Sequence, residues 1–228
     1  MTVIQDPVLT EYVNRVGKRL TASREAQESG FPFTFEVVAD PSINAFALPG
    51  GPMFINTGLL RAVDNEAQLA GVMGHEMSHV ILRHGTNQAT KRNLIQLPAV
   101  LASQMAGSGT MAGQLAQLGI GLGANSVILR FSRTAESQAD LLGSHLMSEA
   151  GYDPVEMARF FHKLNAQGGH GLQFLSDHPN PDNRERAIQD EARALPPKKY
   201  TSDTGEFKRM KEALGTIHEP KPKPQAGQ

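Results

Sequence analysis

The amino-acid sequence predicts an α+β domain that is mainly helical and contains a small antiparallel sheet. Apolar residues recur with helical spacing near the N-terminus, and short alternating segments with glycine and proline occupy residues 33–56. Nearly everything after Thr57 has a helical pattern. A chain of 228 residues fits one domain of ordinary size. We therefore expect one domain over residues 1–195 and a C-terminal extension over residues 196–228, with a disordered end.

The first part of the chain is expected to supply one helix and the sheet. Asp6 and Pro7 are typical of an N-cap and the first helical position, and the apolar stripe that follows predicts a helix to about Glu25. Residues 33–38 alternate apolar and polar side chains, which predicts a strand. Residues 44–56 predict two short strands around a Pro-Gly-Gly-Pro turn.

A long helix is predicted in the middle of the chain. Asp64 or Asn65 can act as its N-cap, and its apolar pattern continues to His84. Gly85 is expected to stop it, since glycine is the usual residue just after a helix.

Further helices are predicted over about residues 126–150, after the Asp-Pro pair at 153–154 and after the Asn-Pro pair at 180–181. Residues 219–228, EPKPKPQAGQ, are too rich in proline and too poor in apolar groups to pack, so they predict a disordered tail or a linker.

The composition excludes several classes of protein. There are 22 Lys and Arg against 23 Asp and Glu, and a formal net charge of -1 gives no field that would favour nucleic acid. The chain has no cysteine, so any metal must be bound by histidine and carboxylate. The N-terminus lacks the basic and apolar segments of a signal peptide. We expect either a cytosolic protein or one whose targeting segment is missing from this sequence.

Residues 93–129 contain no charged side chain. Pro98, six glycines and several polar residues interrupt them, so a transmembrane helix is not expected. One interpretation is a set of small-residue helices packed on the core. The other is an apolar flap over a site or against a membrane surface, which would make a peripheral membrane contact.

The segment GVMGHEMSHVILRHG predicts a metal site on an active-site helix. His75 and His79 are four positions apart, so both imidazoles can reach a common ion about 2 Å away. Glu76 is turned by about 100° and is placed to take a proton from a water on that ion. Chance spacing is disfavoured because the surrounding residues are apolar, and a buried helix rarely carries three polar side chains without a use.

A hydrolytic zinc needs a third protein ligand and one open position. Glu136 and Asp140 lie one helical turn apart, so one can bind the metal while the other accepts the free N–H of a ligand histidine. Taken alone, these acids could instead form a solvated face paired with Arg130 and Arg133. His145 is a rival third ligand that would explain one residue rather than two.

Four stretches occur in order along the chain: NAFALPGGPMFINTGLL, GHEMSHVILRHG, FSRTAESQAD and SDHPNPDNRERA. They resemble the gluzincin metalloproteases of the CAAX-prenyl-protease type, peptidase family forty-eight, and in particular the soluble bacterial envelope branch. The resemblance covers about residues 5–195 and implies a zincin-like metalloprotease domain. It implies one Zn²⁺ per chain on His75, His79 and Glu136, with Glu76 as catalytic base and Asp140 behind the ligands.

The resemblance also implies a location and a class of substrate. Soluble bacterial members work in the periplasm, often at the outer membrane, on unfolded or misassembled proteins. The multi-span membrane core of the prenyl-protease branch is missing from this sequence, so prenylated substrates are not expected. A zinc endopeptidase is therefore the leading prediction. The alternatives are a holdase-like protein binder with structural zinc and a zinc hydrolase of another bond.

Peptide hydrolysis also needs a donor for the oxyanion and a place for the substrate. His178 is the first candidate donor and Arg184 the second, although His178 could instead cap the zinc as a fourth ligand, and both could be ordinary surface groups. NAFALP is expected to form an edge strand to which an extended peptide adds by backbone hydrogen bonds. The predicted substrate-binding residues are Asn44, Ala45, Phe46, Ala47 and Leu48.

Overall fold

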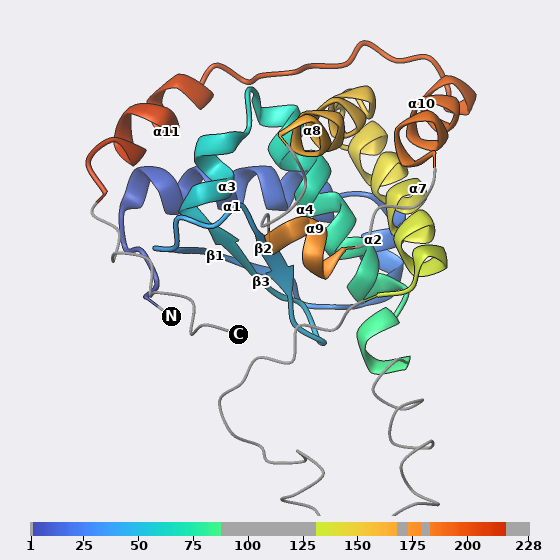
Figure 1. Cartoon of the computed structure of the whole chain (residues 1–228), viewed down its shortest axis with the longest axis horizontal. Coiled ribbons are helices and arrows are strands. Elements are labelled where there is room, and N and C mark those ends of the chain that lie inside the picture. Colours follow the sequence, from blue (N-terminus) through green and yellow to red (C-terminus); the bar gives the residue numbers. More distant parts are fainter. Residues whose placement is uncertain (1, 88–130, 168–172, 179–182, 218–228) are drawn as a thin grey trace, which may run out of the picture.

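The computed structural model describes residues 2–87, 131–167, 173–178 and 183–217 (Figure 1). The predicted α+β, mainly helical class is confirmed. The described elements are α1 (Pro7–Thr21), α2 (Arg24–Ser29), β1 (Thr34–Val38), β2 (Ala45–Ala47), β3 (Pro52–Asn56), α3 (Thr57–Ala62), α4 (Glu66–Ile81), α7 (Arg133–Glu149), α8 (Val155–Ala166), α9 (Gln173–Asp177), α10 (Arg184–Ala194) and α11 (Phe207–Leu214).

Helix α4 lies between the sheet and the C-terminal helices (Figure 1). Helix α1 packs on β1 and also contacts α4, while β2 contacts α4 from the sheet side. Helices α7 and α8 pack against α4, and α10 packs against both of them. The core therefore surrounds α4, which carries the histidine motif.

Helix α1 begins as predicted but ends earlier. The side chain of Asp6 accepts a hydrogen bond from Leu9 N at 3.0 Å, as an N-cap does. The helix ends at Thr21 rather than near Glu25, because Ser23 adopts an extended conformation with ψ 151° and begins α2 instead. The apolar stripe of α1 is buried as its spacing predicts, and it consists of Leu9, Tyr12, Val13, Val16 and Leu20.

The sheet has three strands in the order β1-β3-β2 and is mixed rather than purely antiparallel. Strands β2 and β3 form the predicted antiparallel hairpin, and Gly50 and Gly51 in its turn take positive φ values of 98° and 118°. Strand β3 returns next to β1 and pairs with it in parallel. The prediction of an antiparallel sheet is wrong for this pair, because the hairpin places β2 on the outside and brings β3 back in the direction of β1.

Helix α4 is buried along nearly its whole length. Asn65 is the N-cap, and its side chain accepts a hydrogen bond from Gln68 N at 2.9 Å. The helix ends at Ile81, so the predictions of an end at His84 and a stop at Gly85 are wrong. Arg83 takes the left-handed conformation with φ 56° and turns the chain before the glycine is reached.

The C-terminal helices follow the predicted order with shifted starts. Helix α7 begins at Arg133 because Ser132 caps it by accepting a hydrogen bond from Ala135 N at 3.2 Å. The predicted start near residue 126 lies outside the described residues, as do the Asn-Pro pair at 180–181 and the tail at 219–228. Helix α11 packs against α1 and α3. The division into a domain and an extension at residue 195 stays a prediction.

Helices α4 and α7 approach each other closely at two glycines. A Cβ atom at Gly74 would lie 3.3 Å from Gly143 O, and a Cβ atom at Gly143 would lie 3.1 Å from His75 N. No larger residue fits at this crossing without a shift of the helices. The close approach allows side chains of α7 to reach the histidines of α4.

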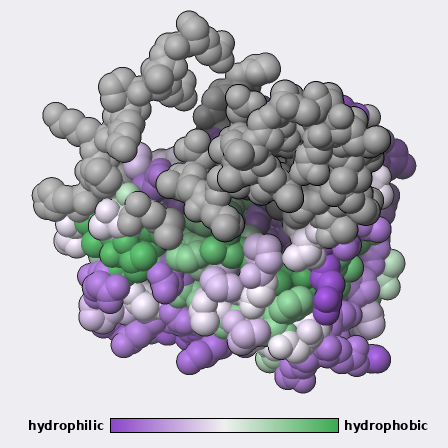
Figure 2. Space-filling model, turned by 90° about the horizontal axis from the view of Figure 1, so that it is seen from below, coloured by the Kyte–Doolittle hydropathy of each residue, from purple (hydrophilic) through white to green (hydrophobic). Residues whose placement is uncertain are grey.

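The apolar stretch at 93–129 lies outside the described residues. Within the part of the chain that the structure describes, no helix has both the length and the apolar character needed to cross a bilayer. The face seen from below Figure 1 presents apolar residues between polar ones (Figure 2). Large apolar side chains that stay exposed among the described residues are Leu48, Leu82 and Leu141. Leu48 directly follows β2, Leu82 directly follows α4, and Leu141 lies in α7.

Candidate metal centre

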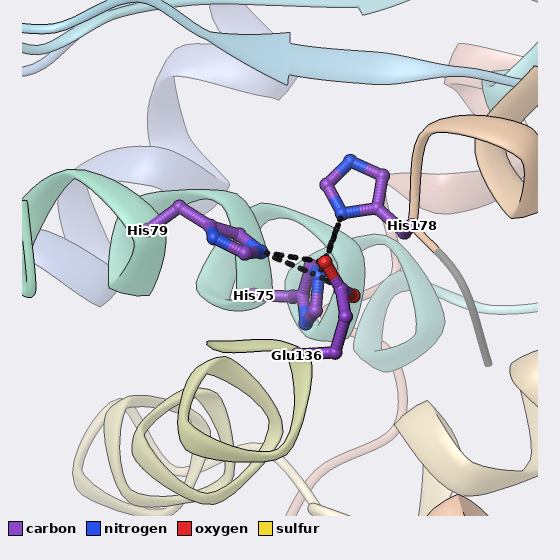
Figure 3. Close-up of side chains that lie close together, drawn as sticks. All are labelled: His75, His79, Glu136 and His178. Atoms are coloured by element: carbon purple, nitrogen blue, oxygen red, sulfur yellow. Dashed lines mark hydrogen bonds and ion pairs between the residues drawn. The ribbon is translucent and has the colours of Figure 1, made fainter. Parts of the chain in front are cut away.

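Four buried side chains from three parts of the chain converge at one point (Figure 3). His75 and His79 come from α4, Glu136 comes from the first turn of α7, and His178 directly follows α9. Each offers one ligand atom, and these atoms all lie within 4.8 Å of one another. The structure therefore brings together the two histidines and the distant carboxylate that the sequence predicted.

Four distances between neighbouring ligand atoms are close to those around a tetrahedral ion. His75 Nε2 lies 3.1 Å from His79 Nε2 and 3.2 Å from His178 Nδ1. Glu136 Oε1 lies 3.2 Å from His178 Nδ1 and 3.5 Å from His79 Nε2. Ligands about 2.0 to 2.1 Å from a zinc ion in a tetrahedron are about 3.3 Å apart. Glu136 Oε2 is buried as well and lies 3.2 Å from His75 Nε2, so both oxygens of the carboxylate face the histidines.

Asp140 contacts His75 on the ring nitrogen that points away from the other ligand atoms, and its role behind a bound metal stays a prediction. His75 Nδ1 donates to Asp140 Oδ1 at 2.9 Å, and Arg184 Nη2 donates to the same oxygen at 2.7 Å. The guanidinium of Arg184 also lies over the ring of Phe161, 3.7 Å from its centroid. With the proton on Nδ1, the lone pair of His75 Nε2 faces the other ligand atoms.

The pKa values of the cluster show which groups are ready to bind a cation. Burial lowers the pKa of His75. Its hydrogen bonds to Asp140 and Glu136 raise this pKa by a larger amount, so that the net value is about 9. Burial and the charges of His75 and His178 hold the pKa of His79 well below its ordinary value. Burial raises the pKa of Glu136, but hydrogen bonds from His178 and His75 lower it more. Glu136 is thus ionised and His79 neutral near pH 7, whereas a cation would compete with a proton for His75.

Glu76 lies beside the cluster rather than in it. Its Oε2 accepts a hydrogen bond from Ala47 N at 3.3 Å, and its Oε1 lies 3.1 Å from His178 Nε2. Burial raises the pKa of Glu76, while the charges of His178 and His75 lower it. The net shift is upward, which suits a group that accepts and returns a proton.

Strand β2 is the outer strand of the sheet on the side of the cluster. The backbone of Asn44 and Leu48 bonds to β3 at 3.1 and 2.8 Å. Because backbone direction alternates along a strand, Ala45 and Ala47 direct their backbone groups to the other edge of β2, which pairs with no further strand among the described residues and is called the free edge below. Ala47 N already donates to Glu76 there. The free edge of β2 therefore runs next to the carboxylate.

The side chains of the predicted substrate strand have different surroundings. Asn44 Nδ2 donates to Asp177 Oδ2 at 3.2 Å, which ties the strand to α9. Phe46 stacks on Phe54 with ring centroids 5.2 Å apart, and Leu48 is 45% exposed. The structure thus places these residues beside the cluster, and their role in substrate binding stays a prediction.

His84 is a neighbour of the cluster that the sequence did not assign to it. The sequence marked His84 only as the expected end of the long helix, yet its Nδ1 lies 3.0 Å from His79 Nδ1. Burial lowers the pKa of His84. The rival ligand His145 is not in the cluster, and its Nε2 lies 2.6 Å from Glu191 Oε1. The signal for His84 was its five-residue spacing from His79, which has no established meaning on a regular helix.

The fold and the site together define a zincin-like metallopeptidase domain: a small sheet, a histidine-motif helix beside its outer strand, and a carboxylate from a second helix. Comparison with known families agrees, since the profile described as Peptidase family M48 matches residues 7–192. The chain belongs to peptidase family M48. The family predicted from the four sequence stretches is confirmed.

Several characterised proteins are similar to this chain. The beta-barrel assembly-enhancing protease of Yersinia pestis is 33% identical over 208 residues, which cover 86% of this chain and 41% of that protein. Mitochondrial metalloendopeptidase OMA1 of Schizosaccharomyces pombe is 34% identical over 85% of this chain and 56% of its own length. Metalloprotease LoiP of Escherichia coli is 32% identical over 81% of this chain and 72% of its own length. This chain therefore spans less than half of the first of these relatives.

Proposed function

We propose that this chain is a zinc-dependent endopeptidase that binds one Zn²⁺ through His75, His79 and Glu136. The observation that carries the proposal is the convergence of two imidazoles and one buried carboxylate, whose ligand atoms lie 3.1 to 3.5 Å apart. Asp140 and Arg184 support the site from behind, because both engage the outer side of His75. The names of the related metalloproteases agree with this activity.

When bound, zinc would polarise the scissile carbonyl and lower the pKa of a water to about 7. Glu76 accepts the proton of the attacking water and returns it to the leaving amine. Its buried position next to the ligand side chains, with its pKa raised, suits this exchange. The carboxylate of Glu76 also accepts a hydrogen bond from Ala47 N, which orients this carboxylate towards β2.

His178 occupies the place that a catalytic zinc keeps open. We propose that it caps the ion in a resting state, because its Nδ1 lies 3.2 Å from both His75 Nε2 and Glu136 Oε1. The alternative is that His178 donates a hydrogen bond to the oxyanion. In that role its ring would lie beside the ion and not among the ligand atoms. Arg184 is the second candidate for this donor. Its bond to Asp140 favours a supporting role for it instead.

The substrates we propose are unfolded or misassembled envelope proteins. An extended chain that adds to the free edge of β2 is recognised through its backbone, which demands little sequence but excludes folded segments. Relatives such as the Yersinia pestis protein are named for enhancing beta-barrel assembly, which supports an envelope role. We propose the periplasm or the outer-membrane periphery as the location. A peripheral membrane contact through residues 93–129 is part of the same proposal.

The test compares zinc content and proteolysis in three forms of the chain. Wild type is expected to bind one zinc and digest casein and an unfolded outer-membrane barrel protein, while leaving the folded barrel intact. Glu76→Gln should keep the zinc and lose digestion, and Glu136→Ala should lose both. Equal absence of digestion in wild type and Glu76→Gln, with casein still bound, would favour the holdase-like alternative. Zinc bound without cleavage of any peptide would point to a hydrolase of another bond.

A further inference from the structure

His84, three residues beyond the end of α4, forms a bridge from His79 of that helix to Gln138 of α7. Its Nδ1 lies 3.0 Å from His79 Nδ1, and its Nε2 lies 3.1 Å from Gln138 Oε1. The rings of His79 and His84 meet nearly edge to face, with centroids 5.0 Å apart and planes at 71°. Two imidazoles that meet through their Nδ1 atoms must share a single proton between them.

The position of that proton follows from the third member of the bridge. The amide oxygen of Gln138 only accepts, so the His84 nitrogen that faces it must carry a proton. A neutral His84 then has a lone pair on Nδ1, which accepts from His79 Nδ1–H. His79 is thereby left with a lone pair on Nε2, the nitrogen that faces His75 and Glu136.

We propose that His84 is a positioning residue that holds His79 in the tautomer able to bind the metal, and that Gln138 in turn orients His84. The proposal rests on the proposed zinc site. It gives each ligand histidine its own partner, Asp140 for His75 and His84 for His79. Most ligand histidines donate their outer N–H to a carboxylate, a backbone carbonyl or water, so an imidazole in this role is unusual.

The charges around the site explain why a neutral acceptor is suited to His79. Glu136, Asp140 and Glu76 are three buried carboxylates within the same region, with Arg184 as the buried cation among the described residues. Together with a divalent ion these four groups sum to zero. A further carboxylate in place of His84 would add a buried negative charge, whereas an imidazole accepts the proton of His79 without one.

The bridge also connects the two helices that supply the ligands. Gln138 follows Glu136 by two positions in α7, so the bridge fixes the end of the α4 segment to the turn that carries the third ligand. Gln138 is itself exposed, and its side chain is therefore held by His84 rather than by burial. Loss of the bridge should loosen His79 more than Glu136, because Glu136 lies fully buried in α7.

The test measures zinc affinity by competition with a chelator. His84→Leu removes the acceptor and should weaken zinc binding about 10- to 100-fold, the usual effect of losing such a partner. His84→Asn places an amide oxygen near the position of Nδ1 and should recover most of the affinity. Gln138→Met keeps the length of the side chain without its acceptor and should cause a smaller loss in the same direction. His162→Leu is the matched control, since the exposed His162 pairs with Glu185 outside the cluster.

Two further readouts separate positioning from a general loss of structure. The metal-free forms should unfold at similar temperatures, and the nitrogen resonances of His79 should show the proton on Nδ1 in wild type and a mixture of tautomers in His84→Leu. Zinc affinity of both His84→Leu and Gln138→Met equal to that of His162→Leu would overturn the proposal while leaving the zinc site intact. Failure of the wild type to bind zinc would instead overturn the proposed function.

Discussion

The backbone of Gly143 in α7 lies directly against the amide nitrogen of His75 in α4. A Cβ atom at Gly143 would sit 3.1 Å from that nitrogen, closer than side-chain carbons normally approach a backbone. Gly74 allows the same approach from the other helix. This contact sets the distance between α4 and α7, and with it the distance from Glu136 to the two histidines of the motif.

The first prediction concerns this contact. Gly143→Ala should raise the helix propensity of α7 by up to about 1 kcal/mol, but the added methyl group must push the helices apart at a cost of about 1 to 3 kcal/mol. We expect a net loss of stability in urea unfolding of the metal-free protein and a weaker zinc affinity. Thr134→Ala, an exposed position in the same helix, should change neither. A variant more stable than wild type with unchanged affinity would show that the crossing tolerates a side chain.

The second prediction distinguishes the two roles of His178. If His178 caps the ion in a resting state, His178→Ala removes the competitor of water, and kcat/KM on an unfolded substrate should rise. An open form populated at about 10% would give a rise of about tenfold. Zinc affinity should fall at the same time, because one ligand is lost. Gln173→Ala, an exposed change in α9, serves as the control. A fall in kcat of about 100-fold or more would assign His178 to the oxyanion instead.

The third prediction concerns the free edge of β2. A peptide that adds to this edge directs every second backbone N–H towards Ala45 and Ala47 and the others away from them. Methylation of single backbone nitrogens along a substrate peptide should therefore lower kcat/KM at alternate positions, by about 2- to 10-fold for each lost hydrogen bond. The intervening positions should be nearly unaffected. Equal effects at all positions would exclude strand addition as the mode of binding.

Local patterns predicted the parts of the site that depend on neighbours in sequence. The four-residue spacing of His75 and His79 places them on one face of α4, and Asn65 caps that helix because its side chain reaches a backbone N–H three residues on. Chemistry singled out the pair of Glu136 and Asp140, because a histidine pair requires a further ligand and these acids lie one helical turn apart. The resemblance to the metalloproteases implied which of the two would bind the ion. These inferences needed no knowledge of how the helices pack.

Contacts between distant segments could not be predicted in the same way. The parallel pairing of β1 and β3 depends on which side of the sheet the hairpin occupies, and nothing in the alternation of residues 33–56 encodes that choice. The partner of His84 depends on the turn at Arg83, where a non-glycine residue takes a left-handed conformation. The importance of Gly143 is equally hidden, because a glycine within a helix indicates a close contact without naming its partner.

The last prediction is a pH dependence at the start of α4. Burial raises the pKa of Glu156, but hydrogen bonds from Asn65 and Gln68, together with Arg159, bring it below its ordinary value of 4.5. A carboxylate with a lowered pKa stabilises the folded state fully above about pH 4.5, and this contribution is lost as pH falls through the folded-state pKa. Glu156 therefore anchors the N-cap of the helix that carries His75 and His79.

Replacing Glu156 by glutamine turns an amide donor towards the donors of Asn65 and Gln68. We expect Glu156→Gln to lower the free energy of unfolding by about 1 to 2 kcal/mol at pH 7. The difference from wild type should shrink as pH falls below 4.5, because protonated Glu156 also loses its advantage. Urea unfolding of metal-free wild type and Glu156→Gln between pH 7 and pH 2 measures this difference in the free energy of unfolding. Titrations of other groups occur in both proteins and cancel in the difference. Glu28→Gln, in an exposed pair with Arg24, should have little effect at any pH. A difference that stays constant down to pH 2 would mean that packing, and not the charge, accounts for the contribution of Glu156.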